Sequence, residues 1–236
     1  ILADAVGTAE MAQYALAAKF GLITAVFIQP FDLWWHARRF NCLNETNGHE
    51  RCATFASYGV LIAMGSALLI AATGPSLVRL MTPEAYHQSI QYIPWLAALA
   101  ALHNATSTLG FGAMSENTTV RPAIIDGIGA AIALVGYLLL IPHYHAWGAI
   151  AATTLALSVR FALMYKVSQA TLHLPYPARR LLLMLCATLV ALVLIPTGPM
   201  SWSSLTLIIA VFVCFIAAAW GLGLITLKPF ARLVRS

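Results

Sequence analysis

Long apolar segments alternate with short polar stretches along the chain, and this pattern predicts membrane-spanning helices. A spanning helix needs about 20 mostly apolar residues, and seven segments meet that requirement. They cover residues 12–33, 53–72, 90–110, 122–141, 147–168, 180–195 and 203–227. The strands of a membrane barrel would instead be short and would alternate between apolar and polar positions. We therefore expect an all-α, polytopic membrane bundle with about seven transmembrane helices.

Proline and glycine residues predict where several of these helices end. We expect Pro30 to kink the end of the first helix, and Gly74 with Pro75 to end the second. Pro142 is expected to end the fourth helix in the same way. The longest loop is then expected over residues 34–52, between the first and second helices.

The composition supports a membrane protein and excludes several other classes. Of the 236 residues, 61% are hydrophobic and 9% are charged, whereas soluble domains carry about 25% charged residues. This excludes a soluble enzyme, a disordered region and a small secreted module held by disulfides, for which four cysteines are also too few. The net charge is +5, but the basic residues form no dense stripe interleaved with aromatic residues, so we expect no nucleic-acid partner.

The basic residues predict how the helices are oriented. Ten of the thirteen Lys and Arg residues fall on one side of the predicted bundle, and only Arg79 falls on the other. The ten are Arg38, Arg39, Arg51, Arg121, Lys166, Arg179, Arg180, Lys228, Arg232 and Arg235. Because basic loops stay in the cytoplasm, we expect a cytoplasmic C-terminus and an external N-terminus. An odd number of spans that starts outside is typical of the second part of a longer transporter, so we expect an N-terminal lobe upstream.

Motifs of enzymes and of metal sites are missing from the sequence. It contains no P-loop of the form GxxxxGKS or GxxxxGKT, no HExxH zinc motif and no GxSxG nucleophile elbow. His36, Cys42, His49 and Cys52 lie close together in the sequence, but their spacing matches no zinc module. We therefore expect no enzyme activity, no cofactor and no metal site.

Ionisable residues inside the predicted helices are candidate binding groups. A charge near a helix centre costs about 2.5–3.5 kcal/mol on insertion scales, so such a residue usually faces a cavity or a partner. We expect Lys19 and Arg160 to face a cavity, the alternatives being an internal salt bridge or snorkelling to the membrane interface. The face of the helix that carries Arg160 is made of small residues, which either pack against another helix or line a water-filled space.

Three further polar residues complete the candidate set. Asp126 lies just over one turn into the fourth predicted helix, where it either faces the cavity or reaches cytoplasmic water. His103 and Asn104 lie near the middle of the third predicted helix. His103 is a candidate proton carrier, or else a hydrogen-bonded core histidine. The predicted substrate-binding residues are therefore Lys19, Arg160, His103, Asn104 and Asp126.

Three local sequence patterns occur between Gly7 and Lys166. They are Gly7 followed by Tyr14-Ala-Leu-Ala-Ala-Lys19; Leu77-Val-Arg-Leu-Met-Thr-Pro-Glu-Ala-Tyr86 followed by Ile93-Pro94; and Ile141-Pro-His-Tyr144 followed by Trp147-Gly148-Ala149-Ile-Ala-Ala-Thr153. Together they resemble the second half of the polysaccharide flippases of the MATE-like (MOP) superfamily. The third pattern departs from the family at one point, because His145 stands where the family usually has a glycine after Tyr144.

This resemblance implies a transporter of lipid-linked saccharides for O-antigen or lipopolysaccharide synthesis in the bacterial inner membrane. Residues 1–170 would form helices of the second lobe, and residues 171–236 would add two helices and a cytoplasmic tail. In such proteins two lobes enclose a cavity that opens alternately to each side, and H⁺ or Na⁺ would be the coupling ion. Lys19 falls on the lysine of the first pattern, whereas Arg160 matches no motif. Cations in a water-filled cavity suit a diphosphate-linked saccharide.

Two other functions stay open at this point. A cation-coupled antiporter of drugs or metabolites from the same superfamily would favour acidic and aromatic cavity residues, and this chain has few acids within its predicted helices. An intramembrane enzyme that processes glycans would need external catalytic residues. The external loops offer mainly Glu84, His87, His143 and His145 for that role. We therefore favour the flippase.

Overall fold

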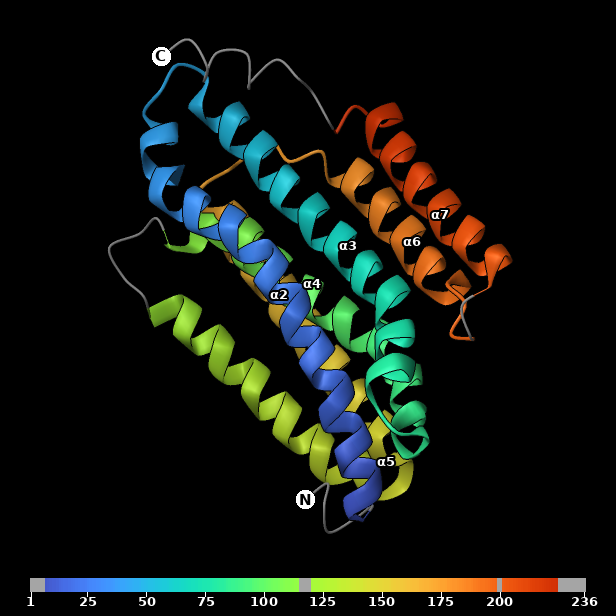
Figure 1. Cartoon of the computed structure of the whole chain (residues 1–236). Coiled ribbons are helices and arrows are strands. Elements are labelled where there is room, and N and C mark those ends of the chain that lie inside the picture. The colour runs from blue at the N-terminus through green and yellow to red at the C-terminus, as the bar shows by residue number, and fades with distance from the viewer. Residues whose placement is uncertain (1–6, 115–119, 199–200, 225–236) are drawn as a thin grey trace.

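The computed structural model describes residues 7–114, 120–198 and 201–224, and the described chain is helical with no strand. It contains six α-helices and two short 3₁₀ helices (Figure 1). In chain order these are α2 (Thr8–Leu43), α3 (Gly48–Met81), η1 (Glu84–Tyr92), α4 (Ile93–Leu109), η2 (Gly110–Met114), α5 (Val120–Thr171), α6 (Ala178–Leu194) and α7 (Trp202–Gly221).

Four of the described helices are long and apolar enough to cross a membrane: α2, α3, α5 and α7. The expectation of an all-helical membrane protein agrees with this finding. The predicted count of about seven spans is not confirmed, because α4 and α6 have only 17 residues each and because two of the predicted segments lie in the single element α5.

The long helix α5 is in fact bent back on itself as a hairpin. Its 52 residues would extend about 78 Å as one straight helix, more than twice the ~30 Å thickness of the hydrocarbon core. The backbone of His145 is not helical, with φ 54° and ψ −131°. On either side of this bend the Tyr137 and Thr153 hydroxyl oxygens lie 2.8 Å apart. The break that we predicted at Pro142 thus lies three residues later, and the two halves pack against each other.

Two predictions about the first half of the chain are wrong: the helix end at Gly74 and Pro75, and the loop over residues 34–52. Helix α2 continues through Pro30 to Leu43, and α3 continues through Gly74 and Pro75 to Met81. The expected loop over residues 34–52 is mostly helical, with a short connection at residues 44–47. Side chains beyond each proline are buried, which holds the helices together despite the hydrogen bond that each proline removes: Trp35 and Val78 are each 1% exposed.

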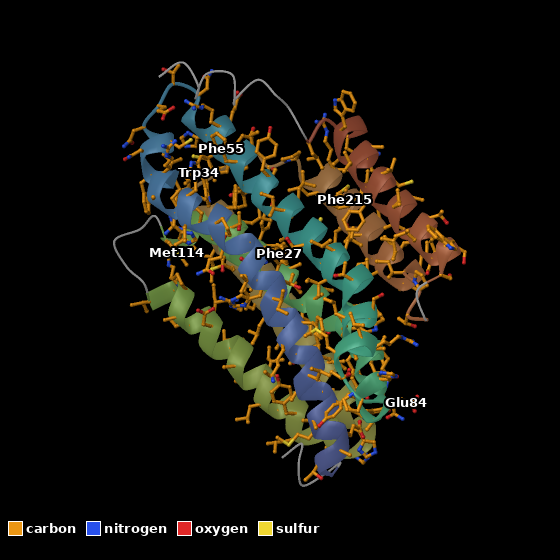
Figure 2. All side chains as sticks on the ribbon, viewed as in Figure 1. Phe27, Trp34, Phe55, Glu84, Met114 and Phe215 are labelled. Carbon is orange, nitrogen blue, oxygen red and sulfur yellow. The ribbon has the colours of Figure 1, made fainter. Side chains whose placement is uncertain are left out.

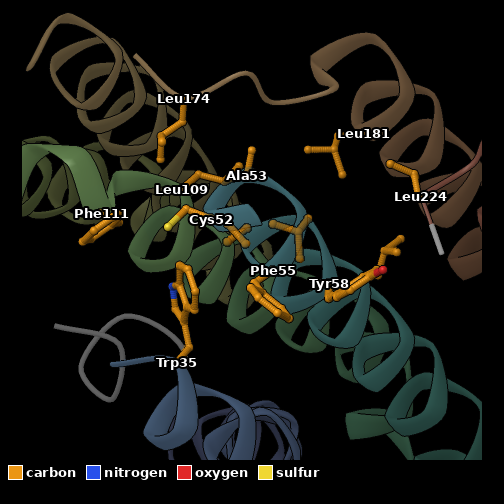
Figure 3. Close-up of a cluster of buried hydrophobic side chains, with 14 of the residues drawn as sticks. Trp35, Cys52, Ala53, Phe55, Tyr58, Leu109, Phe111, Leu174, Leu181 and Leu224 are labelled. Atoms are coloured by element: carbon orange, nitrogen blue, oxygen red, sulfur yellow. The ribbon is translucent and has the colours of Figure 1, made fainter. Parts of the chain in front are cut away.

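A cluster of aromatic side chains fixes that end of α2 against α3 and η2 (Figure 3). The Trp35 ring centroid lies 6.0 Å from those of Phe55 and Phe111, and Trp34 meets Phe55 edge-on at 5.2 Å. Such edge-to-face pairs add to the apolar area that is buried. Figure 2 shows Trp34 and Phe55 at one end of the bundle and Glu84 at the other.

Helices α6 and α7 form a pair that packs against α3, whereas the first half of α5 lies on the opposite side of α2 in the view of Figure 1. The Phe215 ring of α7 lies over Gly65 of α3, where an added Cβ would lie 3.5 Å from the ring. The predicted last segment extends past Leu224, and its residues 225–227 and the basic tail lie outside the described residues. The fold therefore presents the α5 hairpin at one edge of the bundle.

Candidate functional site: a charged triad on the α5 hairpin

The two halves of the α5 hairpin bring Asp126 and Arg160 together. The Nε of Arg160 donates a hydrogen bond to Oδ1 of Asp126 across 2.6 Å. The bond is charge-assisted, since both groups are ionised. The two side chains differ in accessibility: Arg160 is 16% exposed and Asp126 is 52% exposed. The guanidinium is therefore the fixed member of the pair, and the carboxylate is the member that reaches the surface.

His103 of α4 is the third member of this group. Nη1 of Arg160 lies 3.0 Å from Nδ1 of His103. A guanidinium can only donate, so Nδ1 must accept, and the proton of the neutral imidazole must be on Nε2. This arrangement requires an unprotonated Nδ1. We call Asp126, Arg160 and His103 the charged triad.

Small residues allow the two halves of the hairpin to approach closely enough for this contact. A Cβ added to Gly136 would lie 2.7 Å from the Cβ of Ala152, and one added to Gly129 would lie 3.5 Å from the Cβ of Arg160. The small residues predicted beside Arg160 therefore pack against the other half of the hairpin, as small residues do at membrane helix interfaces. They do not by themselves line a water-filled space.

The bend of the hairpin is held by a residue from α2. The backbone N–H of Ala146, at the start of the second half of α5, donates to Oε1 of Glu10 across 3.2 Å. A carboxylate at a helix N-terminus accepts an otherwise free N–H and interacts favourably with the helix dipole. Glu10 thus fixes the bend, and the bend fixes the register of the two halves.

The position of the triad along α5 predicts that it lies within the membrane. Arg160 is 14 residues beyond Ala146, about 21 Å along the helix. Tyr144 and Trp147 at the bend are 62% and 41% exposed, as is typical of aromatic residues at a membrane interface. With the bend at one interface, the Arg160 guanidinium is still within the ~30 Å of hydrocarbon, nearer the predicted cytoplasmic side.

The guanidinium retains donors beyond those used in the triad. Its Nε and Nη1 are engaged by Asp126 and His103, and within the described residues no acceptor is bonded to Nη2. A planar guanidinium binds carboxylate and phosphate groups through paired N–H donors. The site can therefore hold an anion at the open edge of Arg160.

The structure does not bring the other two predicted residues into this group. Lys19 is exposed on α2, and no described residue forms a hydrogen bond or ion pair with it. Asn104 is buried, at 8% exposure, whereas the neighbouring His103 is exposed. Asn104 therefore faces the interior of the bundle, away from the triad.

A cavity of about 530 Å³ lies elsewhere, between α4, α5 and α6. Trp95, Trp147 and Leu192 are among its lining residues, and the Trp95 and Trp147 rings meet edge-on at 6.2 Å. None of the five predicted substrate-binding residues lines it. This cavity therefore does not support the prediction that those residues line a substrate cavity.

Glu10 and the pair of Tyr137 and Thr153 are contacts that we did not predict from the sequence. The hairpin itself contains a signal that could have found the pair. In an antiparallel hairpin, residues that are equally far from the bend lie opposite each other. Tyr137 and Thr153 each lie 8 residues from His145, and Asp126 and Arg160 lie 19 and 15 residues from it. Glu10 has no comparable signal, because it belongs to a distant helix.

Comparison with known proteins finds no matching family model, no similar curated protein and no similar solved structure. The function is therefore inferred from the residues of this chain and from the resemblance of its local patterns.

Proposed function

We propose that the chain is one lobe of a membrane transporter for lipid-linked saccharides, and that Arg160 binds the phosphate groups of the lipid carrier. The lobe would act with a second lobe upstream, by alternating access, in the bacterial inner membrane with its C-terminus in the cytoplasm. The resemblance of the three local patterns to polysaccharide flippases supports this proposal.

One observation carries the proposal: an ionised pair at membrane depth that is open on one side. The Asp126 side chain is 52% exposed, and a charge that faces lipid at this depth costs about 2.5–3.5 kcal/mol or more. Polar groups in such positions face a bundle interior or a water-filled space. We infer that the open side of the triad faces the transport pathway between the two lobes.

The chemistry of the triad suits an anionic ligand better than a cationic one. Arg160 is the least exposed charge in the group, and among the described residues no acceptor engages its Nη2. A phosphate oxygen can accept from such donors in a bidentate arrangement. Lys19, the second candidate cation, is exposed on α2 and unpaired among the described residues. We propose that it attracts the same anionic ligand from a distance.

The experiment is transport by the complete protein in proteoliposomes. The substrate is a fluorescent saccharide on a short polyprenyl diphosphate, and a neutral alkyl glycoside with the same sugar and fluorophore is the comparison. We expect transport of the diphosphate-linked saccharide alone. Lys19→Gln should reduce it, Lys19→Arg should retain part of it, and Lys166→Gln, which removes an exposed cation of α5 outside the triad, should not affect it. Equal transport of the neutral glycoside, or no transport of either, would contradict the proposal.

A further inference from the structure

Both partners of Arg160 share one chemical requirement. Asp126 accepts from Nε as a carboxylate, and His103 accepts from Nη1 as a neutral imidazole. Each of them accepts this hydrogen bond only when the accepting atom is unprotonated. A proton weakens both contacts: Asp126 loses its negative charge, although its carbonyl oxygen can still accept, and His103 loses the lone pair that accepts at Nδ1.

The side chains of Asp126 and Arg160 also differ in how freely they can move. The Arg160 side chain is 16% exposed, packs over Gly129 and is held from a second helix by His103. Asp126 is 52% exposed and can turn toward the open side. When the pair opens, the carboxylate therefore moves and the guanidinium stays.

From this geometry we propose that Arg160 is an anion-exchange site, at which the Asp126 carboxylate and a phosphate of the ligand compete for the same guanidinium. A proton on Asp126 or His103 shifts the site from the internal carboxylate to the ligand. The identity of the ligand as a lipid-linked phosphate rests on the proposed function, but the exchange itself does not.

The exchange is balanced in charge and in bonds. Without ligand, the guanidinium cation is neutralised by the Asp126 anion. When Asp126 takes up a proton it becomes a neutral acid, and the Nε–H and Nη donors bind the phosphate oxygens instead. No covalent bond forms or breaks. Because the ligand prefers the protonated site, its binding and proton uptake must favour each other.

Among the residues that the structure describes, few other ionisable groups lie near the triad. Within α5, Arg121 lies five residues before Asp126 and Lys166 six residues after Arg160, and both are exposed. His103 is the titratable group that α4 contributes, and η2, which also packs against α5, has none among Gly110–Met114. Helix α2 meets α5 at Glu10, beside Ala146 at the bend. A pH effect on anion binding is therefore assigned to Asp126 and His103.

The test measures anion binding to the purified full chain by isothermal titration. The main probe is dihexyl diphosphate, a diester whose two charged oxygens stay ionised throughout the pH range used. Sulfate is the second probe, and it represents a free anion with no lipid chains. Wild-type protein should bind dihexyl diphosphate more tightly at about pH 4.5 than at about pH 7.5, because a proton on His103 removes the acceptor at Nδ1 and adds a positive charge beside Arg160.

Four variants test whether Arg160 exchanges its carboxylate partner for a ligand or only forms an ion pair with Asp126. Asp126→Asn should bind about fivefold more tightly at neutral pH, and the Asp126→Asn/His103→Gln double variant should no longer respond to pH. Arg160→Gln should lose binding. Glu84→Gln, which changes an exposed carboxylate at the other end of the bundle, should behave as wild type. Melting curves of all the variants confirm that the folded protein is being compared.

The results of these measurements test the exchange at Arg160, the kind of anion that it binds and the proposed function separately. Equal affinity of wild type and Asp126→Asn, with both folded, would overturn the exchange, as would unchanged binding by Arg160→Gln. Equal binding of sulfate and dihexyl diphosphate would support the exchange and identify a free anion as its ligand. If the binding pattern is as expected but the complete protein does not transport lipid-linked saccharide, the exchange stands and the proposed function fails.

Discussion

Arg160 donates to Asp126 across 2.6 Å although 34 residues separate them in the chain. The contact exists because α5 turns back at His145 and places its two halves in antiparallel register. The ion pair is therefore a consequence of the bend and of the small residues that line the hairpin. Any change that shifts this register should separate the two side chains.

Gly136 provides the clearest test of the close packing in the hairpin. Its added Cβ would lie 2.7 Å from the Cβ of Ala152, so Gly136→Ala should force the two halves apart. We expect a loss of about 1–3 kcal/mol in the free energy of unfolding, measured by titration with dodecyl sulfate in mixed micelles. Gly127 of the same half has no atom within 4 Å of an added Cβ. Gly127→Ala should therefore be neutral or stabilise the helix by up to ~1 kcal/mol, and equal losses for both variants would contradict the packing.

His145 should be a site where glycine stabilises the protein. Its φ of 54° lies in a region that glycine adopts easily and that strains other residues. We expect His145→Gly to raise the free energy of unfolding by about 1 kcal/mol. His143→Gly is the matched control: His143 is exposed and helical two residues earlier, so glycine there should destabilise by about 1 kcal/mol. A loss of stability in His145→Gly would show that the bend is not strained.

The sequence predicts the helical class well, because that class depends on local composition. Each predicted segment falls largely on described helix, and three of the five predicted binding residues meet in one place: His103, Asp126 and Arg160. The hydropathy pattern cannot show that α2 extends to Leu43, because its last turns carry polar residues. Their helical state depends on Trp35 packing against Phe55 and Phe111.

The proline signals had mixed outcomes: Pro75 was expected to end a helix and does not, whereas Pro30 was expected only to kink one. Pro30 and Pro75 both lie inside continuous helices, whereas the break near Pro142 does occur, at His145. Proline removes the same backbone donor in each case. What differs is the tertiary contact beyond it, such as the burial of Val78 after Pro75, and local sequence does not contain that information.

The orientation of the chain is a separate prediction that follows from the basic loops. A reporter inserted in the bend, at residues 142–146, should be external, and one in the connection at residues 44–47 should be cytoplasmic. The ten-to-one distribution of Lys and Arg gives the reason. Accessibility of single cysteines to a membrane-impermeant thiol reagent measures both positions in intact cells. Labelling of residues 44–47 but not of 142–146 from outside would reverse the proposed orientation.

The central claim is that Arg160 serves the ligand and not only the stability of the hairpin. Removing one member of an ion pair leaves an uncompensated charge, so single variants lower stability for reasons unrelated to transport. The double variant Asp126→Asn/Arg160→Gln removes both charges at nearly constant shape, and should therefore fold with normal yield.

The most direct measurement is transport of the diphosphate-linked saccharide by this double variant, per amount of folded protein in the same proteoliposomes. We predict that folded yield is retained and that transport is lost, because the guanidinium that binds phosphate is gone. Normal transport by the folded double variant would contradict the account and leave the pair of Asp126 and Arg160 as a purely structural contact.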